Sequence, residues 1–251
     1  MDVLRRELAR QGLNVQAVAP GRGFEALLPG CRSALVFGSG GPLLWDRFLE
    51  WLRQDPRRLS EQDHPLDHFV EQLVSRVDPT PQGRRWVFAA SDFQPRVDFQ
   101  GLARSANMAW DSRLFLLLHP EFGPWLGLRA ACLTTEELPV AEPLGPALCE
   151  SCPSPCITAC PGKAVGDRGF SWPLCALHRA RTRDCQGGCL SRRACPVGSQ
   201  HRYSELQLLY HSNVSVGRPA LAAHLGIDDR RRPVSTDWKE LARVARSMLG
   251  D

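Results

Sequence analysis

Residues 149–196 read CESCPSPCITACPGKAVGDRGFSWPLCALHRARTRDCQGGCLSRRACP and contain eight of the ten cysteines of this 251-residue chain. The cysteines form two ordered groups, and each group closes with a Cys-Pro pair. The first group is Cys149-x2-Cys152-x3-Cys156-x3-Cys160-Pro161, and the second is Cys175 followed by Cys185-x3-Cys189-x5-Cys195-Pro196.

This order is typical of a ferredoxin-type module that holds iron–sulfur clusters. Closely spaced cysteines supply three thiolates to one cluster, and the cysteine before the proline serves the other cluster of a two-cluster ferredoxin. The rule predicts two 4Fe–4S clusters held by two sets of four thiols. The first thiol set is Cys149, Cys152, Cys156 and Cys195, and the second thiol set is Cys160, Cys175, Cys185 and Cys189.

The spacing departs from a standard run, which leaves alternatives open. Three residues, 153–155, separate the second and third cysteines where two are usual. A single cluster is one alternative, and zinc is another, although only Cys149 and Cys152 have the spacing of a zinc knuckle. Cys31 and Cys132 lie in apolar, strand-like sequence, and we expect buried, inert thiols there.

Composition sets broad limits on the protein class. Hydrophobic residues make up 43% of the chain, and the net charge of +4 is too small to indicate a nucleic-acid partner. No apolar run approaches the ~20 residues of a membrane span, and the charged N-terminus does not resemble a signal peptide. We therefore expect a cytoplasmic protein, and a reducing compartment favours metal binding over disulfides.

Apolar periodicity predicts helices that alternate with strands before the cysteines. Residues 33–38 and 85–90 read as strands, and 43–52 and 64–77 as amphipathic helices. Residues 113–119 and 126–133 are predicted to pair as a hairpin. The pattern indicates an α+β protein in which helices cover a sheet.

Shifts in composition predict three domains. Residues 1–147 form an α/β cofactor-binding core, and their Pro- and Glu-rich end, 136–147, is a linker. Residues 148–200 form the ferredoxin-like iron–sulfur module. Residues 201–251 form a helical tail that we expect to pack on the core.

The cysteine order resembles that of epoxyqueuosine reductase and the reductive dehalogenases, and so do residues 106–113 and 119–125. This resemblance implies two 4Fe–4S clusters, bound cobalamin, a catalytic Asp92 that donates a proton, and Trp110 and Arg113 at the cofactor. The glycines of the family segment at 106–113 are replaced here, and Arg113 stands at its lysine position. The family's C-terminal extension, which handles tRNA, has no counterpart in this sequence, so epoxyqueuosine reduction is the alternative reading.

The chain also resembles the animal cobalamin-processing chaperone at residues 119–129 and 202–207. This resemblance implies four cofactor-binding residues, Trp125, Arg129, Arg202 and Tyr203. Of these, Arg129 and Arg202 would face an anionic ligand, such as a thiol tripeptide or a corrinoid side chain. Both families share a nitroreductase/flavin-reductase-like core. FMN is therefore the alternative to cobalamin.

Several candidates outside the cysteines also have a plain structural role as an alternative. Asp92 suits an Asx turn, and Arg129 and Arg202 suit surface ion pairs. His119 is predicted to cap a turn, and His178 to lie on a helix surface.

We expect a redox enzyme that passes electrons from its clusters to cobalamin. The electrons come from a donor protein such as a flavodoxin or ferredoxin; no membrane is expected, and a nucleic-acid partner is not favoured. A ferredoxin-type electron carrier without enzymatic activity is the remaining alternative.

Overall fold

The computed structural model describes residues 1–89, 96–228 and 237–249 and divides into two compact units. Unit 1 comprises Met1–Trp110 and Trp125–Pro146, and unit 2 comprises Asp111–Pro124 and Ala147–Asp251. No helix among the described residues is long and apolar enough to span a membrane.

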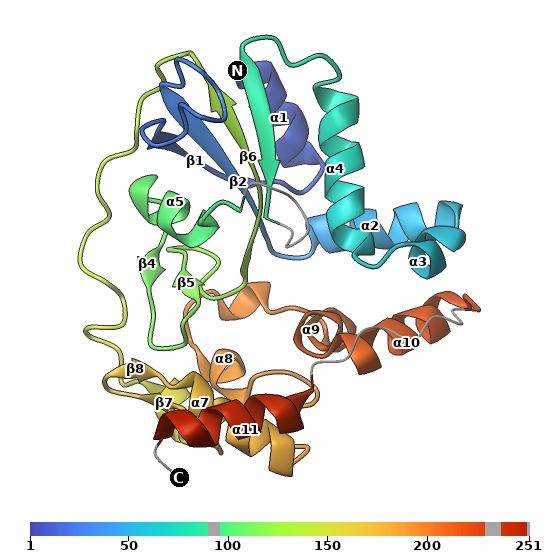
Figure 1. The fold of residues 1–251 in the computed structure, drawn as a ribbon, viewed down its shortest axis with the longest axis vertical. Helices are drawn as coiled ribbons and strands as arrows, with labels where there is room; N and C mark the ends of the chain where they lie inside the picture. Colours follow the sequence, from blue (N-terminus) through green and yellow to red (C-terminus); the bar gives the residue numbers. More distant parts are fainter. Residues whose placement is uncertain (90–95, 229–236, 250–251) are drawn as a thin grey trace. The chain divides into compact units, whose positions relative to one another are not determined.

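Unit 1 is built on a four-stranded antiparallel sheet of order β1-β2-β6-β3 (Figure 1). Its strands are β1 (Val15–Pro20), β2 (Ser33–Gly40), β3 (Arg84–Phe88) and β6 (Leu126–Thr134). Every residue of β2 is buried, because neighbours pair with both of its edges and side chains cover both of its faces. Cys31 and Cys132 are buried here, as predicted, and burial raises the pKa of Cys132 to about 12.

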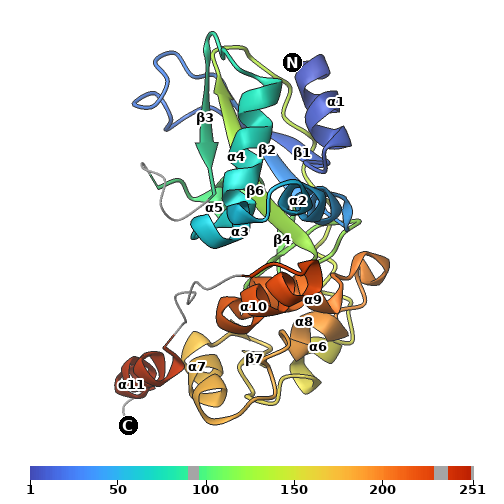
Figure 2. The ribbon, with the colours of Figure 1, turned by 90° about the vertical axis from the view of Figure 1, so that its right-hand side faces the viewer.

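Helices cover this sheet on both faces, with α5 on the side away from α1 and α4 (Figures 1 and 2). They are α1 (Asp2–Arg10), α2 (Leu43–Gln54), α3 (Arg57–Glu61), α4 (Pro65–Val77) and α5 (Phe99–Ser105). Apolar side chains at three- and four-residue spacing bury one face of α2 and α4. Phe48, Trp51 and Phe69 join these two helices with ring centroids 5.5 to 6.2 Å apart.

Unit 2 consists of short helices and tight loops around the cysteines. The helices are α6 (Pro155–Thr158), α7 (Trp172–Arg181), α8 (Leu190–Ala194), the 3-10 turn η1 (Ser199–His201), α9 (Glu205–Ser212), α10 (Val214–Leu225) and α11 (Trp238–Leu249). The strands β7 (Val165–Gly166) and β8 (Gly169–Phe170) form a two-residue hairpin. The last helix, α11, lies along α7 (Figures 1 and 2).

The predicted hairpin of residues 113–119 and 126–133 is wrong. Residues 126–134 pair with β2 and β3 instead, and the earlier segment contributes only β5 (Leu117–Leu118), which pairs with β4 (Trp110–Asp111). Phe115 adopts a positive φ of 60°, and the Ser112 hydroxyl accepts a hydrogen bond from the Leu114 backbone. These local turns interrupt the strand that the apolar run suggests.

The mixed α+β class is confirmed, and the predicted strand at 33–38 and the helices at 43–52 and 64–77 are present; of the strand predicted at 85–90, residues 85–88 belong to β3, and residue 90 lies outside the described residues. Strand β1 was not predicted, because its residues, Val15–Pro20, do not alternate cleanly between apolar and polar.

Candidate metal centre

The four thiols of the second thiol set line one cavity of about 220 Å³ in unit 2. Cys160 lies after α6, Cys175 lies in α7, and Cys185 and Cys189 come from the loop between α7 and α8. Apolar side chains form much of the remaining wall; among them are Leu114, Leu116, Val165 and Phe170. The chain therefore surrounds one largely apolar space with four sulfur donors.

The same four thiols are electrostatic neighbours. Burial raises the pKa of Cys175 to about 11; Arg179 opposes this shift, and the thiols of Cys189, Cys185 and Cys160 add to it. Burial also raises the pKa of Cys185, and the nearby Cys189 contributes in the same direction. Four thiols that disfavour each other's negative charge are the arrangement that a bound cation stabilises.

Backbone amides donate hydrogen bonds to these sulfurs. The amide of Ala164 lies 3.2 Å from the Cys160 Sγ, and the backbone of Leu190 lowers the pKa of Cys185 by a hydrogen bond. The loop after Cys160 packs closely against α7: a Cβ added at Gly162 would lie only 2.7 Å from the Cβ of His178. Amide-to-sulfur hydrogen bonds of this kind tune iron–sulfur clusters.

Three thiols of the first thiol set adjoin a small apolar cluster of unit 2. Cys195 is buried with Leu114, Leu118 and Val165, and Cys149 and Cys156 pack against this group, as does Cys160 of the second thiol set. Burial raises the pKa of Cys195, and Cys149, Cys156 and Cys152 each add to the rise. The grouping of thiols thus follows the crossing pattern of the two Cys-Pro pairs, whereas iron binding by either set stays a prediction.

Arg113 anchors the loop that carries the first thiols. Its Nη1 donates to the Cys149 carbonyl at 2.9 Å and to the Ser154 hydroxyl at 2.7 Å. Its charge also lowers the pKa of Cys156, although burial raises that pKa more strongly. The structure therefore gives Arg113, predicted from the resemblance to lie at the cofactor, direct contacts with the first cysteine loop.

Two residues of the cavity wall were not found from the sequence. His178 was predicted on a helix surface, which is wrong: its side chain is only 15% exposed and lines the cavity, with Nε2 3.0 Å from the Thr182 hydroxyl. Ser191 is 1% exposed, lines the same cavity, and its hydroxyl has no hydrogen-bond partner among the described residues. The position of each, three residues after Cys175 and two after Cys189, was the available signal.

The turn at residues 119–125 is held by the backbone contacts that its glycine allows. His119 caps the turn as predicted, since its Nδ1 accepts hydrogen bonds from the Glu121 and Phe122 amides at 3.1 and 3.2 Å. Gly123 has a φ of +56°, and a Cβ there would lie 2.0 Å from the Val197 carbonyl oxygen. This turn therefore packs against the segment that follows Cys195-Pro196.

Three predicted cofactor residues belong to unit 1. Trp125 is fully buried, and Trp110 Nε1 donates to the Gly145 carbonyl at 2.9 Å. Arg129 lies within β6, where it donates to the Ser39 hydroxyl at 3.3 Å and lies 4.0 Å from Asp67. Asp92, the predicted catalytic acid, falls outside the described residues.

The other two, Arg202 and Tyr203, belong to unit 2. Arg202 is exposed, whereas Tyr203 is buried and packs under the guanidinium of Arg192, 4.7 Å from its ring centroid. The next residue, Ser204, caps α9 by accepting a hydrogen bond from the Gln207 amide at 3.2 Å. Part of the motif at 202–207 thus encodes a helix N-terminus.

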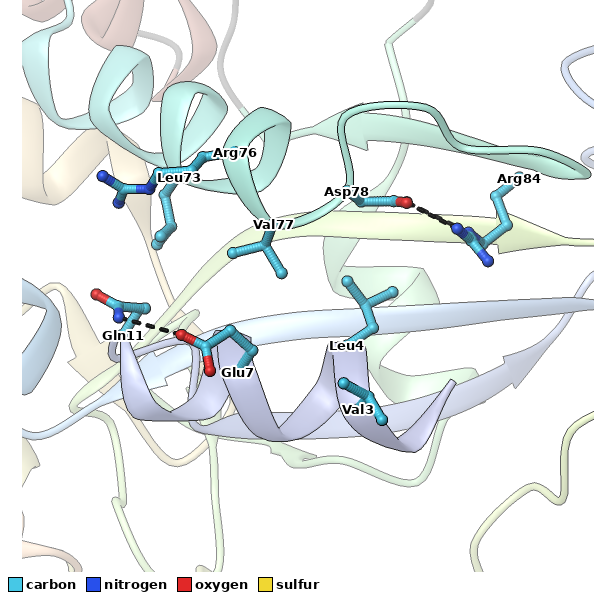
Figure 3. Close-up of a pocket in the computed structure, with 9 residues that line it drawn as sticks. All are labelled: Val3, Leu4, Glu7, Gln11, Leu73, Arg76, Val77, Asp78 and Arg84. Carbon is cyan, nitrogen blue, oxygen red and sulfur yellow. Dashed lines mark hydrogen bonds and ion pairs between the residues drawn. The ribbon is translucent and has the colours of Figure 1, made fainter.

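Three cavities of unit 1 are lined by residues other than the predicted cofactor residues Trp110, Trp125 and Arg129. One of about 520 Å³ lies between α1 and α4, and its walls include Val3, Leu73 and the Asp78–Arg84 ion pair (Figure 3). Two others, of about 440 and 560 Å³, are lined by α5, the residues just before it and the segment 20–27, and by α4 with Trp51. Among the residues that the structure describes, no group of three or more His, Cys, Asp or Glu side chains has the geometry for a single metal ion.

Comparison with known proteins gives structural neighbours only. No protein-family model and no curated protein sequence matches the chain. The fold is similar to the B12-trafficking protein CblC of C. elegans, a homologue of human MMACHC, with a TM-score of 0.57, 15% identity, and coverage of 92% of this chain and 97% of that one.

The fold is also similar to epoxyqueuosine reductase. The Streptococcus thermophilus enzyme matches with a TM-score of 0.54, 13% identity, and coverage of 100% of this chain and 82% of that one. A structure of the reductase with an epoxyqueuosine-modified tRNA stem loop matches with a TM-score of 0.53, 14% identity, and coverage of 97% and 79%. Both families named from the sequence are therefore structural neighbours, and at this identity the likeness concerns the fold.

Proposed function

We propose that this chain is an iron–sulfur redox protein that carries two 4Fe–4S clusters and delivers electrons to a bound corrinoid. The observation that carries the proposal is the convergence of Cys160, Cys175, Cys185 and Cys189 on one cavity of about 220 Å³. A 4Fe–4S cluster needs four thiolates around one enclosed space, and a chain with two such sets can hold two clusters.

The residues around the thiols suit such a group. When bound, the clusters supply one-electron transfer. The chain contributes the thiolates, apolar walls that limit water, and amide hydrogen bonds to sulfur, of which the one from Ala164 to Cys160 is 3.2 Å long. Arg113 holds the loop of the first thiol set through the Cys149 carbonyl. Burial and hydrogen bonding of this kind adjust the reduction potential.

The corrinoid part of the proposal rests on the fold likeness to a B12-trafficking protein and on the motifs at 119–129 and 202–207. We propose that Trp110, Trp125 and Arg129 of a nitroreductase-like core, residues 1–147, contribute to its site, with Asp92 as the acid. We propose that Arg202 and Tyr203 contribute from the tail, residues 201–251, which follows a ferredoxin-like module at 148–200. The reaction is corrinoid reduction or reductive removal of its upper ligand.

Two cysteine variants, one in each thiol set, test whether the chain holds two clusters. Under anaerobic purification, Cys175→Ala removes the cluster of the second thiol set, and Cys156→Ala removes that of the first; each leaves about four irons. Low-temperature EPR then shows a different remaining signal in each variant. If neither variant loses iron, or if the two variants give identical EPR spectra, the assignment of two thiol sets is contradicted.

A titration tests the corrinoid. Reduced wild-type protein is mixed with cob(II)alamin, and the visible and EPR spectra of the cobalt are followed. A shifted cobalt signal on binding, followed by conversion to the cob(I) form, supports the proposal. A full complement of iron with no cobalt response moves the assignment to a flavin enzyme or an electron carrier, and FMN is then tested by the same titration.

A reductase of the epoxyqueuosine type is the second candidate. It is favoured by the fold likeness to the Streptococcus thermophilus enzyme over 100% of this chain. The test is expression in a strain that lacks its own epoxyqueuosine reductase, with queuosine in tRNA as the readout. Restored queuosine supports this candidate, and its absence with retained cobalamin reduction supports the first.

A further inference from the structure

The net positive charge of the chain belongs to the cysteine segment. Residues 148–200 contain seven Lys or Arg against three Asp or Glu, which accounts for all of the net +4 of the molecule. The rest of the chain is electrically balanced. A charge confined to the redox segment indicates that this segment meets an anionic partner.

Four of these seven cations are exposed, and their side chains make no hydrogen bond or ion pair with any residue in the described ranges; they are Lys163, Arg168, Arg181 and Arg183. The other three are engaged within unit 2: Arg179 with the Ser212 carbonyl, Arg192 with the Pro124 carbonyl, and Arg193 with Glu205. The four exposed charges are therefore available to a partner.

These four cations, here called the rim, lie on the chain segments that line the cavity of the second thiol set. Each lies within two residues of a residue that lines the cavity: Lys163 next to Gly162, Arg168 before Phe170, Arg181 after Arg179, and Arg183 before Cys185. The acids nearby are Asp167, which is exposed, and Asp184, which lies 3.4 Å from His178. The rim of this cavity thus keeps a positive excess.

Exposed apolar side chains accompany these charges. Phe115 is 68% exposed and stacks on the cavity residue Phe170 with ring centroids 6.1 Å apart. Leu190 lines the cavity and is also exposed, as are Trp172 and Leu174 of α7. A few apolar contacts within a ring of like charges are typical of small, transient interfaces between redox proteins.

We propose that this rim is the docking surface for a small acidic one-electron carrier protein, which reduces the cluster of the second thiol set first. The inference rests on the proposed function, because it needs a cluster in that cavity. In the reaction the carrier loses one electron and the cluster gains one, and no bond forms or breaks. Opposite charges accelerate encounter, and the short-lived complex needs little buried area.

The test compares two triple variants that change the charge equally. R168E/R181E/R183E reverses the rim, and R6E/R22E/R53E reverses three exposed arginines of unit 1. Iron content and cluster potentials are measured first. Stopped-flow absorption then follows reduction of the oxidised protein by a reduced flavodoxin at low salt. We expect the rim variant to react at least about tenfold more slowly, and the unit 1 variant to react as the wild type does.

A second measurement needs no variant. The rate of wild-type reduction by flavodoxin must fall as the ionic strength rises, whereas reduction by photoreduced deazaflavin, which is small and neutral, must not. A rate that is flat or rises with salt overturns the docking surface. So does equal slowing in both triple variants, or a rim variant that loses affinity for a tRNA stem loop while its reduction rate is unchanged. If the wild-type protein contains no iron, the proposed function itself is contradicted.

Discussion

Ser191 is a fully buried serine at the cavity of the second thiol set, and its hydroxyl has no partner among the described residues. An unsatisfied buried hydroxyl is costly, so a bound cluster whose sulfur accepts its hydrogen bond removes that cost. A hydrogen bond to sulfur stabilises the more negative, reduced cluster and raises its potential.

Ser191→Ala should therefore lower the potential of the second cluster without loss of iron. A hydrogen bond worth about 0.5–1.5 kcal/mol corresponds to roughly 20–60 mV for one electron. Redox titration followed by EPR measures the shift, and Ser199→Ala, an exposed serine of unit 2, is the matched control. An unchanged potential in Ser191→Ala would show that the hydroxyl does not reach the cluster.

Gly198 is the glycine that lets the chain pass the turn at 119–125. Its φ is +66°, and a Cβ would lie 2.3 Å from the Phe122 carbonyl carbon, a backbone atom that cannot move aside locally. Gly198→Ala should cost about 2–5 kcal/mol from strain and overpacking, and it should displace Cys195, three residues before it.

Thermal unfolding and iron content together check this prediction. We expect a lower melting temperature and selective loss of the first cluster. Gly166→Ala is the control, because its Cβ would meet no atom within 4 Å and its φ is ordinary. Equal behaviour of the two variants contradicts the role of the close backbone contact.

Asp78 and Arg84 form an ion pair in unit 1, in which the carboxylate is buried and the guanidinium is partly exposed (Figure 3). Burial opposes the charge of Asp78, but hydrogen bonds from Arg84 at 2.7 and 3.2 Å and from Trp86 at 2.8 Å outweigh it and lower the pKa of the carboxyl. Asp78→Asn leaves the partly solvated guanidinium without its anion and should cost about 1.5–3 kcal/mol.

The pH dependence of that loss has a definite sign. The folded-state pKa of Asp78 is depressed, so its stabilisation is complete above the unfolded value of about 3.9 and is lost as the pH falls through the folded value. The difference in melting temperature between wild type and Asp78→Asn should be constant from pH 8 to 5. A difference that already shrinks in that range would contradict the pairing.

At the scale of elements, the contact between α7 and α11 ties the C-terminal helix to the helix that carries Cys175. Ala242 and Ala245 of α11 are buried, and Arg179 of α7 lies over the ring of Trp238, 4.2 Å from its centroid. The small side chains allow the close packing of the two helices.

Ala245→Leu should therefore overpack this contact, at a cost of about 1–3 kcal/mol, and loosen the second thiol set. We expect faster loss of one cluster to an iron chelator, measured by absorption. Val244→Leu, at an exposed neighbouring position, should behave as the wild type. The assignment fails if both variants release iron at the same rate.

The local pattern of apolar residues predicted those helices that bury one face and the strand that is buried along its whole length. The helices at 43–54 and 65–77 have strong periodic apolar faces, and β2 is buried throughout. The hairpin at 113–133 was wrong because two apolar runs joined by a turn do not reveal which strand each will pair with; here β6 lies between β2 and β3. Strand pairing is set by the whole sheet.

At the scale of the molecule, the order of the cysteines predicted more of the candidate site than any other feature. The positions of the two Cys-Pro pairs predict which thiols lie together, because the cysteine ligands of an iron–sulfur module lie close to one another in sequence. Arg113, His178 and Ser191 could not be assigned in this way, since their contacts with the cysteine loops exist only in the folded chain. The candidate corrinoid residues are spread over both units, which no local pattern can bring together.

The most direct test of the central claim is the iron and acid-labile sulfide content of the anaerobically purified wild-type protein. Two clusters predict about eight irons and about eight sulfides per chain. Zinc in place of iron would contradict the claim because Zn²⁺ is not redox-active, and iron without acid-labile sulfide would contradict it because a 4Fe–4S cluster contains four sulfides.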